Sequence, residues 1–388
     1  LHEKSLPIMS KAEMTGRERI LATIRHEEPD RVPVSPRVAA WLKAEFGDAS
    51  LDTHFERLPD MDVMAIAGDG TPNTLESYPD EYDLPEVSVD QKKYADGQLV
   101  IVERTFRTPA GDISDRTMIP PAGRRYGVSP NPVKTDYLVK GPDDLPALKY
   151  ILHEVNTNFD FLHECRKKVG DRGVVMVCIR SALDHNAGYA RSMLDLMTDY
   201  YDNRPFFDEL LGIFHRRSLA QVSAALKGGA EIIFGSWYFN SLSAGWSPAI
   251  FSEVFVPQIR DHVVLTHCYG AYYDYYDDGK LDDSMEMIAD ADVDVLETCT
   301  PAPVGDFNLA RAKETIGRTT TLKGYVDLLY VVKHGSTELV EQTVRDAMAI
   351  AKPGGGFIIG SSDSFREGTP MENIVAYFEA CRKYGSYH

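Results

Sequence analysis

Cysteines are few in this sequence and none are paired. Five cysteines are scattered over 388 residues, and no two of them form a Cys-x-x-Cys motif. A disulfide framework or a zinc ribbon needs paired or closely spaced cysteines, so we expect neither. Free thiols persist in a reducing environment, and the cytoplasm is therefore the expected setting.

Long apolar runs are also missing. No stretch approaches the roughly 18 consecutive apolar residues that a membrane-spanning helix requires, so no membrane segment is predicted. Residues 1–14 lack the apolar centre of a secretory signal peptide. We expect a disordered lead-in there, followed by one folded domain over residues 15–388.

Basic residues are outnumbered by acidic ones. The chain has 41 Lys and Arg residues against 59 Asp and Glu residues, which gives a formal net charge of −18. Binding to a polyanion requires a basic surface, so a nucleic-acid partner is not expected. A hydrophobic content of 43% and a charged content of 26% are typical of a globular protein with a sizeable core.

Apolar, β-forming runs alternate with helical patterns along most of the chain, which is typical of an α/β protein. Eight runs are predicted strands, at residues 31–34, 61–67, 174–179, 231–237, 271–276, 293–297, 319–324 and 355–360. Eight strands joined mostly by helices predict a single-domain (β/α)8 barrel of the TIM type, with an open doubly wound sheet as the weaker alternative. Residues 98–118 interrupt the alternation and read as an inserted β-hairpin.

The most unusual stretch is Gly270–Lys280, which reads Gly-Ala-Tyr-Tyr-Asp-Tyr-Tyr-Asp-Asp-Gly-Lys. Its tyrosine-rich part predicts a strand, and two carboxylates with a glycine follow at the carboxyl end. Barrel proteins bind their ligands at the carboxyl ends of the strands. The sequence Asp-Asp-Gly is also ordinary turn chemistry, so a purely structural role is the alternative.

The ends of the predicted strands supply the other candidate residues. Carboxylates gathered there could bind a metal ion, carry out acid/base chemistry or attract a cation, and aromatic faces suit an ammonium group. Some of the acids could instead cap the turns that follow the strands. The candidates are Asp69, Arg180, Trp237, Tyr238, Tyr276, Asp277, Asp278, Glu297, Cys299, Tyr325, Asp327 and Asp363.

Four segments of the chain carry a recognisable pattern: TGRERIL with HEEPDRVPV in residues 15–34, LETCTPAPVGD at 296–306, LKGYVD at 322–327 and REGTPMEN at 366–373. These segments resemble the uroporphyrinogen decarboxylase superfamily, and most closely its methyltransferase-like branch, which includes corrinoid-dependent methyltransferases. The resemblance extends over nearly the whole chain from Thr15 onward and implies a distorted (β/α)8 barrel with its site in the mouth.

The decarboxylases of this superfamily carry an early arginine-rich motif that grips the acid groups of the substrate. The matching region here, residues 33–40, offers only Arg37. Asp69 resembles the catalytic aspartate of the decarboxylases. A porphyrinogen with eight carboxylates would meet many like charges in this mouth, so decarboxylation through Arg37, Arg180 and Asp69 is the alternative function rather than the first.

The corrinoid methyltransferases of the superfamily hold zinc through a His-x-Cys-Gly motif and a later cysteine. Here the matching positions are Tyr276-Asp-Asp278-Gly279, and the later position falls within residues 360–363. Oxygen ligands have replaced nitrogen and sulfur. Either a harder divalent ion is bound, with Asp278, Glu297 and Asp363 as the ligands, or the acids bind a cationic substrate directly.

The resemblance therefore predicts a methyltransferase that moves a methyl group from a small O- or N-methylated compound to a corrinoid. No Asp-x-His-x-x-Gly corrinoid motif occurs, so the corrinoid would come on a partner protein. The sequence leaves open a homodimer, and a non-catalytic barrel that binds a small cation is a further alternative. The catalytic candidates are Asp69, Asp278 and Glu297, and the substrate-binding candidates are Arg180, Trp237, Tyr238, Tyr276, Asp277, Cys299 and Asp327.

Overall fold

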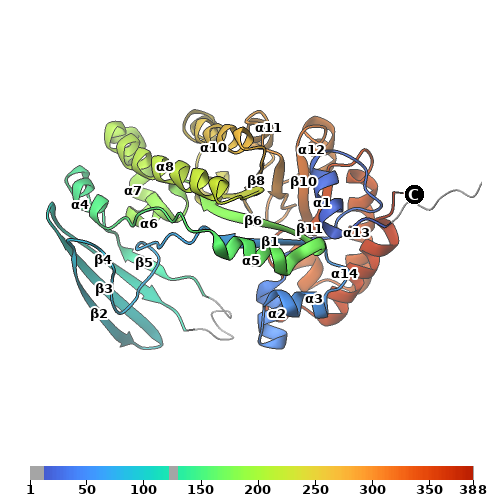
Figure 1. The fold of residues 1–388 in the computed structure, drawn as a ribbon, viewed down its shortest axis with the longest axis horizontal. Helices are drawn as coiled ribbons and strands as arrows, with labels where there is room; N and C mark the ends of the chain where they lie inside the picture. The colour runs from blue at the N-terminus through green and yellow to red at the C-terminus, as the bar shows by residue number, and fades with distance from the viewer. Residues whose placement is uncertain (1–12, 122–129, 388) are drawn as a thin grey trace, which may run out of the picture.

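A curled parallel sheet forms the centre of the molecule, in a computed structural model that describes residues 13–121 and 130–387 (Figure 1). Seven strands follow one another in the order β1-β6-β7-β8-β9-β10-β11, and each pair is parallel. Their bounds are β1 Val63–Gly68, β6 Gly173–Arg180, β7 Ile232–Ser236, β8 Tyr272–Tyr276, β9 Val295–Thr298, β10 Thr321–Val326 and β11 Phe357–Ser361. The predicted α/β class with a parallel sheet is confirmed.

The prediction of a first strand at residues 31–34 is wrong. Val34 forms one isolated parallel bridge with Ile359 of β11, and its carbonyl accepts a hydrogen bond from the Asp62 amide at 2.8 Å. The prolines at positions 33 and 36 lack the amide hydrogens that a regular ladder needs. The segment therefore contacts β11 and β1 without forming a regular ladder with either strand. The parallel sheet of the described residues has seven strands.

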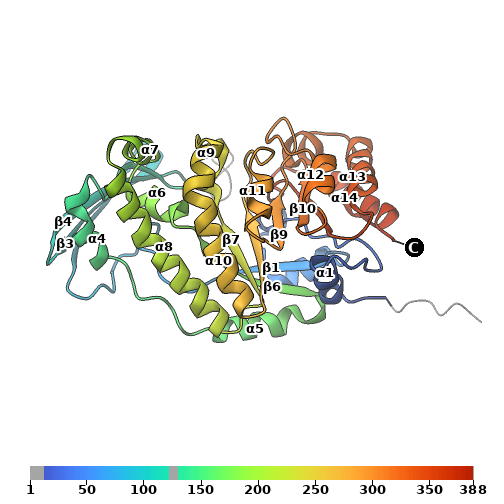
Figure 2. The same ribbon diagram turned by 90° about the horizontal axis from the view of Figure 1, so that it is seen from above.

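Helices pack on the outside of this sheet, and α8, α10, α11 and α12 run side by side across one flank (Figure 2). Among the described residues, none of the helices combines the length and the apolar character needed to cross a membrane. Two of the helices, α2 and α3, were not predicted. The helices are α1 Gly16–Ile24, α2 Ala39–Phe46, α3 Leu51–Arg57, α4 Leu145–Tyr150, α5 Asp160–Val169, α6 Gly188–Ala190, α7 Met193–Asp202, α8 Arg204–Lys227, α9 Pro248–Ile250, α10 Val256–Cys268, α11 Met285–Ala289, α12 Leu309–Thr315, α13 Thr337–Ala351 and α14 Met371–Tyr384.

Helix α1 closes the amino end of the curled sheet. Thr15 and Glu18 form a capping box, which satisfies free amides at the start of the helix. Ile20 and Ile24 of α1 then pack in a cluster with inward-facing residues of the strands, including Met176. The predicted lead-in falls mostly on residues 1–12, outside the described residues, whereas the Met14 amide donates to Asp30 at 3.0 Å.

A second, antiparallel sheet is inserted between β1 and β6 and lies at the left of Figure 1. Its strands are β2 Ser88–Asp96, β3 Leu99–Thr108, β4 Gly111–Ile119 and β5 Val133–Asp136, in that order. The predicted hairpin forms the two middle strands. The flanking strands were missed because β2 is largely exposed and polar, and such a strand has no apolar alternation.

Buried charges tie this inserted sheet to the segment that follows β1. Arg104 of β3 donates to Asp115 of β4 at 2.8 Å, and Lys134 of β5 donates to the same carboxylate. Arg104 also donates to the backbone carbonyls of Thr74 and Ser77, at 2.8 and 2.9 Å. The inserted sheet therefore fixes the course of the chain between β1 and β2.

We predict that Asp115→Asn loosens this connection. The substitution would leave Arg104 and Lys134 buried without their carboxylate, which should cost about 3–5 kcal/mol of unfolding free energy. Urea denaturation and hydrogen exchange of residues 88–119 would measure the loss. Asp112→Asn is the matched control, because Asp112 lies on the same strand and forms only an exposed pair with Arg107 at 3.7 Å. Equal stability of the two variants would contradict the prediction.

Candidate functional site

Glu297 of β9 is held by two cations in the interior of the curled sheet. It lies in register with Tyr276 of β8 on one side and with Lys323 of β10 on the other. Lys323 donates to Glu297 at 2.6 Å, and Arg37 donates to it at 2.9 Å. Burial opposes ionisation, but the two cations outweigh it and hold the pKa of Glu297 below its usual range. Glu297 is thus a buried carboxylate with both oxygens engaged.

Asp274 of β8 is a second buried carboxyl group beside this cluster. It shares the inner face of β8 with Tyr276, because alternate residues of a strand face the same side. Neither of its carboxyl oxygens has a hydrogen-bond partner among the described residues. Burial, and after it the negative charge of Glu297, raises the pKa of Asp274 well above its usual value. This favours a protonated acid next to an ionised one.

Arg37 contacts aromatic faces as well as Glu297. Its guanidinium carbon lies 3.9 Å from the ring centre of Tyr276 and 5.0 Å from that of Phe234. Such stacking adds cation–π attraction to the ion pair. Arg37 therefore pairs with Glu297 through its Nε and stacks on two rings, while its Nη2 has no hydrogen-bond partner among the described residues.

The end of β8 carries the second part of the site. The Tyr276 hydroxyl donates to Asp278 at 3.0 Å. Burial, and next the nearby charge of Asp363, raises the pKa of Asp278 to about 6. Asp363 follows β11 and pairs with Arg366 at 2.6 Å. Asp278 therefore changes protonation near neutral pH.

A close approach of two loops holds Asp278 in place. A Cβ at Gly279 would lie 2.0 Å from the Ser241 hydroxyl oxygen, so only glycine fits there. The Gly279 amide donates to Asp277 at 2.8 Å. Asp277 is almost completely buried, and it shapes this turn from inside rather than facing solvent. Tyr238, from the neighbouring loop, is exposed. Partial burial of its hydroxyl, and next the negative charge of Asp278, raise the pKa of Tyr238.

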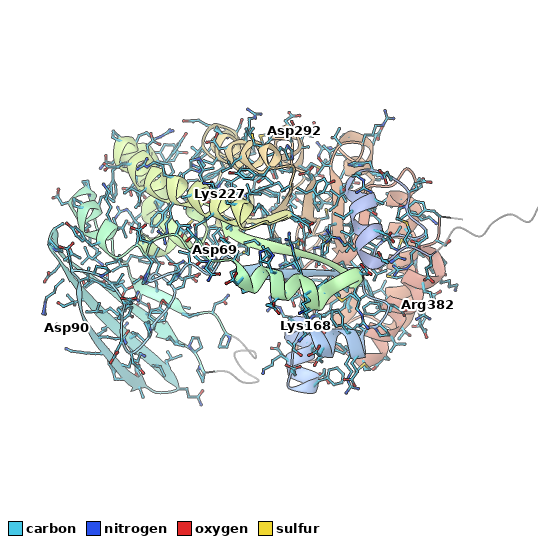
Figure 3. The ribbon with its side chains drawn as sticks, viewed as in Figure 1. Asp69, Asp90, Lys168, Lys227, Asp292 and Arg382 are labelled. Carbon is cyan, nitrogen blue, oxygen red and sulfur yellow. The ribbon has the colours of Figure 1, made fainter. Side chains whose placement is uncertain are left out.

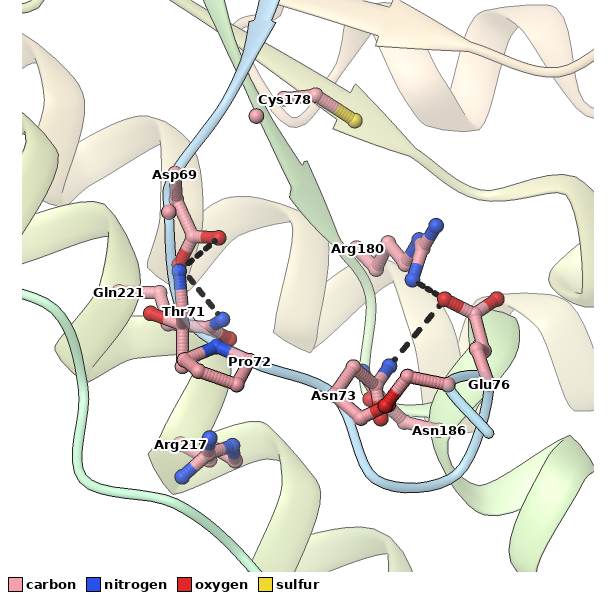
Figure 4. A pocket seen from close by; sticks show the side chains of 13 residues that line it. Asp69, Thr71, Pro72, Asn73, Glu76, Cys178, Arg180, Asn186, Arg217 and Gln221 are labelled. Atoms are coloured by element: carbon pink, nitrogen blue, oxygen red, sulfur yellow. Dashed lines mark hydrogen bonds and ion pairs between the residues drawn. The ribbon is translucent and has the colours of Figure 1, made fainter. Parts of the chain in front are cut away.

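Asp69 belongs to a different part of the mouth, at the end of β1. Figure 3 shows it near the middle of the molecule, below α8 and far from labelled surface residues such as Asp90. Its carboxylate accepts hydrogen bonds from the Gln221 side chain at 2.8 Å and from the Thr71 amide at 3.1 Å. Figure 4 shows both contacts. The loop after β1 and helix α8 together orient Asp69.

A cavity of about 330 Å³ lies beside Asp69 and extends to Arg180 at the end of β6. Arg180 pairs there with Glu76, which also contacts His185 (Figure 4). A second cavity, of about 430 Å³, is lined by Arg37 and Lys323 together with Ile66 of β1. The site therefore has two chambers, one near β1 and β6 and one near the buried Glu297 cluster.

Three of the predicted substrate-binding residues do not face the mouth. Trp237 is fully buried in the layer between sheet and helices, where its indole donates to Tyr273 at 2.9 Å. Cys299 is buried, its thiol donates to the Leu296 carbonyl, and burial raises its pKa well above the usual value. Asp327 caps a helical turn by accepting from the Tyr330 amide at 2.6 Å. These three predictions are corrected here.

The predicted ligands do not fit a metal ion. Among residues 13–121 and 130–387, no group of three or more His, Cys, Asp or Glu side chains could hold one. The physical reason is that both oxygens of Glu297 are occupied by Arg37 and Lys323. Of the two remaining predicted ligands, Asp278 and Asp363, the second is already paired with Arg366 at 2.6 Å.

Sequence reasoning missed several residues of the site. Asp274 and Lys323 were overlooked, although a charged residue inside a predicted buried strand is itself a signal of an interior ion cluster. Glu76, Arg217 and Gln221 had no such signal, because they lie in a loop and on a long helix that reach the mouth only in the folded chain.

These features define an α/β protein with a parallel sheet, a charged cavity at the carboxyl ends of β1 and β6, and a buried ion cluster beside a second cavity. The chain belongs to the uroporphyrinogen decarboxylase (URO-D) family, whose model matches residues 56–384. None of the curated proteins compared with it matches.

Among solved structures, a methyltransferase from Methanosarcina mazei is similar with a TM-score of 0.62 and 16% identity, over 96% of this chain and 99% of that chain. A B12-independent methionine synthase from Shewanella sp. W3-18-1 has a TM-score of 0.46 and 12% identity, over 91% of this chain and 98% of that chain. At 16% identity, the likeness to the methyltransferase shows a shared fold.

We predict that Glu297→Gln strongly destabilises the protein. Arg37 and Lys323 would lose the carboxylate with which they pair among the described residues, which should cost about 3–5 kcal/mol in unfolding free energy. Glu286→Gln is the control, because Glu286 forms an exposed pair with Arg311 and should contribute less than about 1 kcal/mol. Chemical denaturation measures both variants, and a loss below about 1 kcal/mol for Glu297→Gln would show that the cluster is not the stabilising centre.

Proposed function

We propose that this URO-D family protein is a methyltransferase that moves a methyl group from a small O- or N-methylated compound to a corrinoid on a separate protein. The observation that carries the proposal is the state of Arg37. The charge of this guanidinium is already balanced by Glu297 and its face is stacked on Tyr276, so it offers a substrate no unbalanced charge, although its Nη2 has no hydrogen-bond partner among the described residues. A decarboxylase for a polycarboxylate needs free cations at that position.

The groups around Asp278 suit a small methylated substrate. Tyr276 and Tyr238 supply aromatic surface, Asp363 supplies negative charge, and Asp278 supplies a carboxyl group that can be protonated. Aromatic and carboxylate groups together attract cationic or polarised methyl donors. The likeness in fold to a methyltransferase over almost the full length of both chains agrees with this function.

Asp278 is the proposed proton donor. When a methyl group leaves an oxygen or a nitrogen, that atom keeps the electron pair of the broken bond and takes up a proton. A carboxyl group with a pKa of about 6 can hold and release a proton near neutral pH. The corrinoid of the partner protein would supply the nucleophile that accepts the methyl group.

We predict that methyl transfer depends on pH through Asp278. The acid must be protonated to act, so kcat/KM should fall as the pH rises through about 6. Asp278→Asn should lower kcat by about 10²–10⁴-fold and remove this dependence. The measurement is loss of a methylated compound in the presence of a corrinoid acceptor, followed from pH 5 to 8.

Asp283→Asn is the matched control for this experiment. Asp283 lies in the same loop region but is exposed, so its replacement should leave the profile unchanged. A flat profile for the unaltered protein would contradict the role of Asp278. Formation of coproporphyrinogen from uroporphyrinogen would overturn the methyltransferase and support the decarboxylase alternative, and ligand binding without turnover in either assay would leave a small-cation binding barrel.

A further inference from the structure

The cavity beside Asp69 presents one negative and one positive charge that the protein does not neutralise. Asp69 lies at the end of β1, and Arg217 lies on α8. Among the described residues, neither forms an ion pair. Figure 4 shows the two along one side of the cavity, with Arg180 and Glu76 on the other.

The partners of Asp69 are neutral. Its carboxylate accepts hydrogen bonds from the Gln221 amide group and from the Thr71 backbone. These donors orient the carboxylate but leave its charge in place. Asp69 can therefore still bind a cationic group.

The positive charge of Arg217 is likewise not balanced by an ion pair among the described residues. Its hydrogen-bond partner is the backbone carbonyl of His153. Burial lowers the pKa of the Arg217 guanidinium, and the charges of Asp69 and Glu154 offset this only in part. Arg217 and Gln221 lie one turn apart on α8, so they share one face of the helix. Gln221 donates to Asp69, and Arg217 therefore also faces the cavity.

The remaining charges of the cavity cancel each other. Arg180 and Glu76 form an ion pair across from Asp69. The other polar groups are neutral amides and hydroxyls, among them Asn73 and Asn186. A ligand would thus meet one free carboxylate and one free guanidinium.

The lining also distinguishes between kinds of cation. None of the described residues that line the cavity is aromatic, whereas quaternary ammonium groups are bound by aromatic faces. Carboxylate and amide oxygens instead accept hydrogen bonds from N–H groups. An ammonium group that carries at least one N–H bond fits this lining.

We propose that the cavity binds a small amino-acid-like zwitterion, with its ammonium group on Asp69 and its carboxylate on Arg217. The volume of about 330 Å³ is at the lower end of the range for ligand pockets and suits a compact molecule. The inference is independent of the proposed function, because neither Asp278 nor Tyr276 is among the described residues that line this cavity.

Calorimetric titration with four compounds tests the charge assignment. N-Methylglycine carries both charges and two N–H bonds, and butanoate has the same chain with a methylene in place of the ammonium. N-Methylethanolamine keeps the ammonium and lacks the carboxylate, and glycine betaine keeps both charges and lacks N–H bonds. N-Methylglycine should bind roughly tenfold or more tightly than each of the other three.

Three variants connect the binding to the residues. Arg217→Gln and Asp69→Asn should each weaken N-methylglycine binding roughly tenfold or more, since each removes one charge. Arg217→Gln should bring N-methylglycine close to N-methylethanolamine, and Asp69→Asn should bring it close to butanoate. Arg216→Gln is the control, because Arg216 is the exposed neighbour on the same helix and does not line the cavity.

Equal binding of N-methylglycine and butanoate, no binding of any compound, or an unchanged affinity in Arg217→Gln would overturn the zwitterion site. The assay needs no corrinoid, so it is independent of turnover. If N-methylglycine binds as stated and no methylated compound loses its methyl group to a corrinoid acceptor, the site stands and the methyltransferase fails. If methyl transfer occurs from uncharged donors while N-methylglycine does not bind, the methyltransferase stands and the zwitterion site fails.

Discussion

The ion pairs of Glu297 with Arg37 and Lys323 determine what the centre of this protein can do. All three groups lose solvent on folding, and each depends on the others to offset that cost. Arg37 is also packed on the ring of Tyr276. A cation that is held in this way stabilises the interior, and its charge is already balanced by Glu297.

The same cluster separates the protonation states of neighbouring acids. Glu297 is kept ionised by its cations, whereas burial beside Glu297 favours the protonated form of Asp274. Asp278 is further out, partly buried and close to Asp363, and its pKa of about 6 is intermediate. Acids whose environments differ in this way can take different roles within one site.

The inserted sheet contributes to the site although it lies outside the parallel sheet. Arg104 holds the backbone at Thr74 and Ser77, and Glu76 between them pairs with Arg180 of β6. Through these contacts the insertion shapes the cavity in which Asp69 and Arg217 lie. The position of the buried Arg104–Asp115 pair is therefore a constraint on the pocket as well as on the stability of the insertion.

Local patterns in the sequence predict the seven strands of the parallel sheet and the placement of Asp69, Arg180, Tyr276 and Asp278 at strand ends, because periodicity is a local property. Only the tertiary structure decided which of these groups work together. Trp237 lies on the outer side of β7 because neighbouring residues of a strand face opposite sides, and Phe234 and Ser236 face inward. Arg217 lies on a distant helix and lines the same cavity as Asp69. Charges and cavities arise between elements, and no local pattern specifies the distances between them.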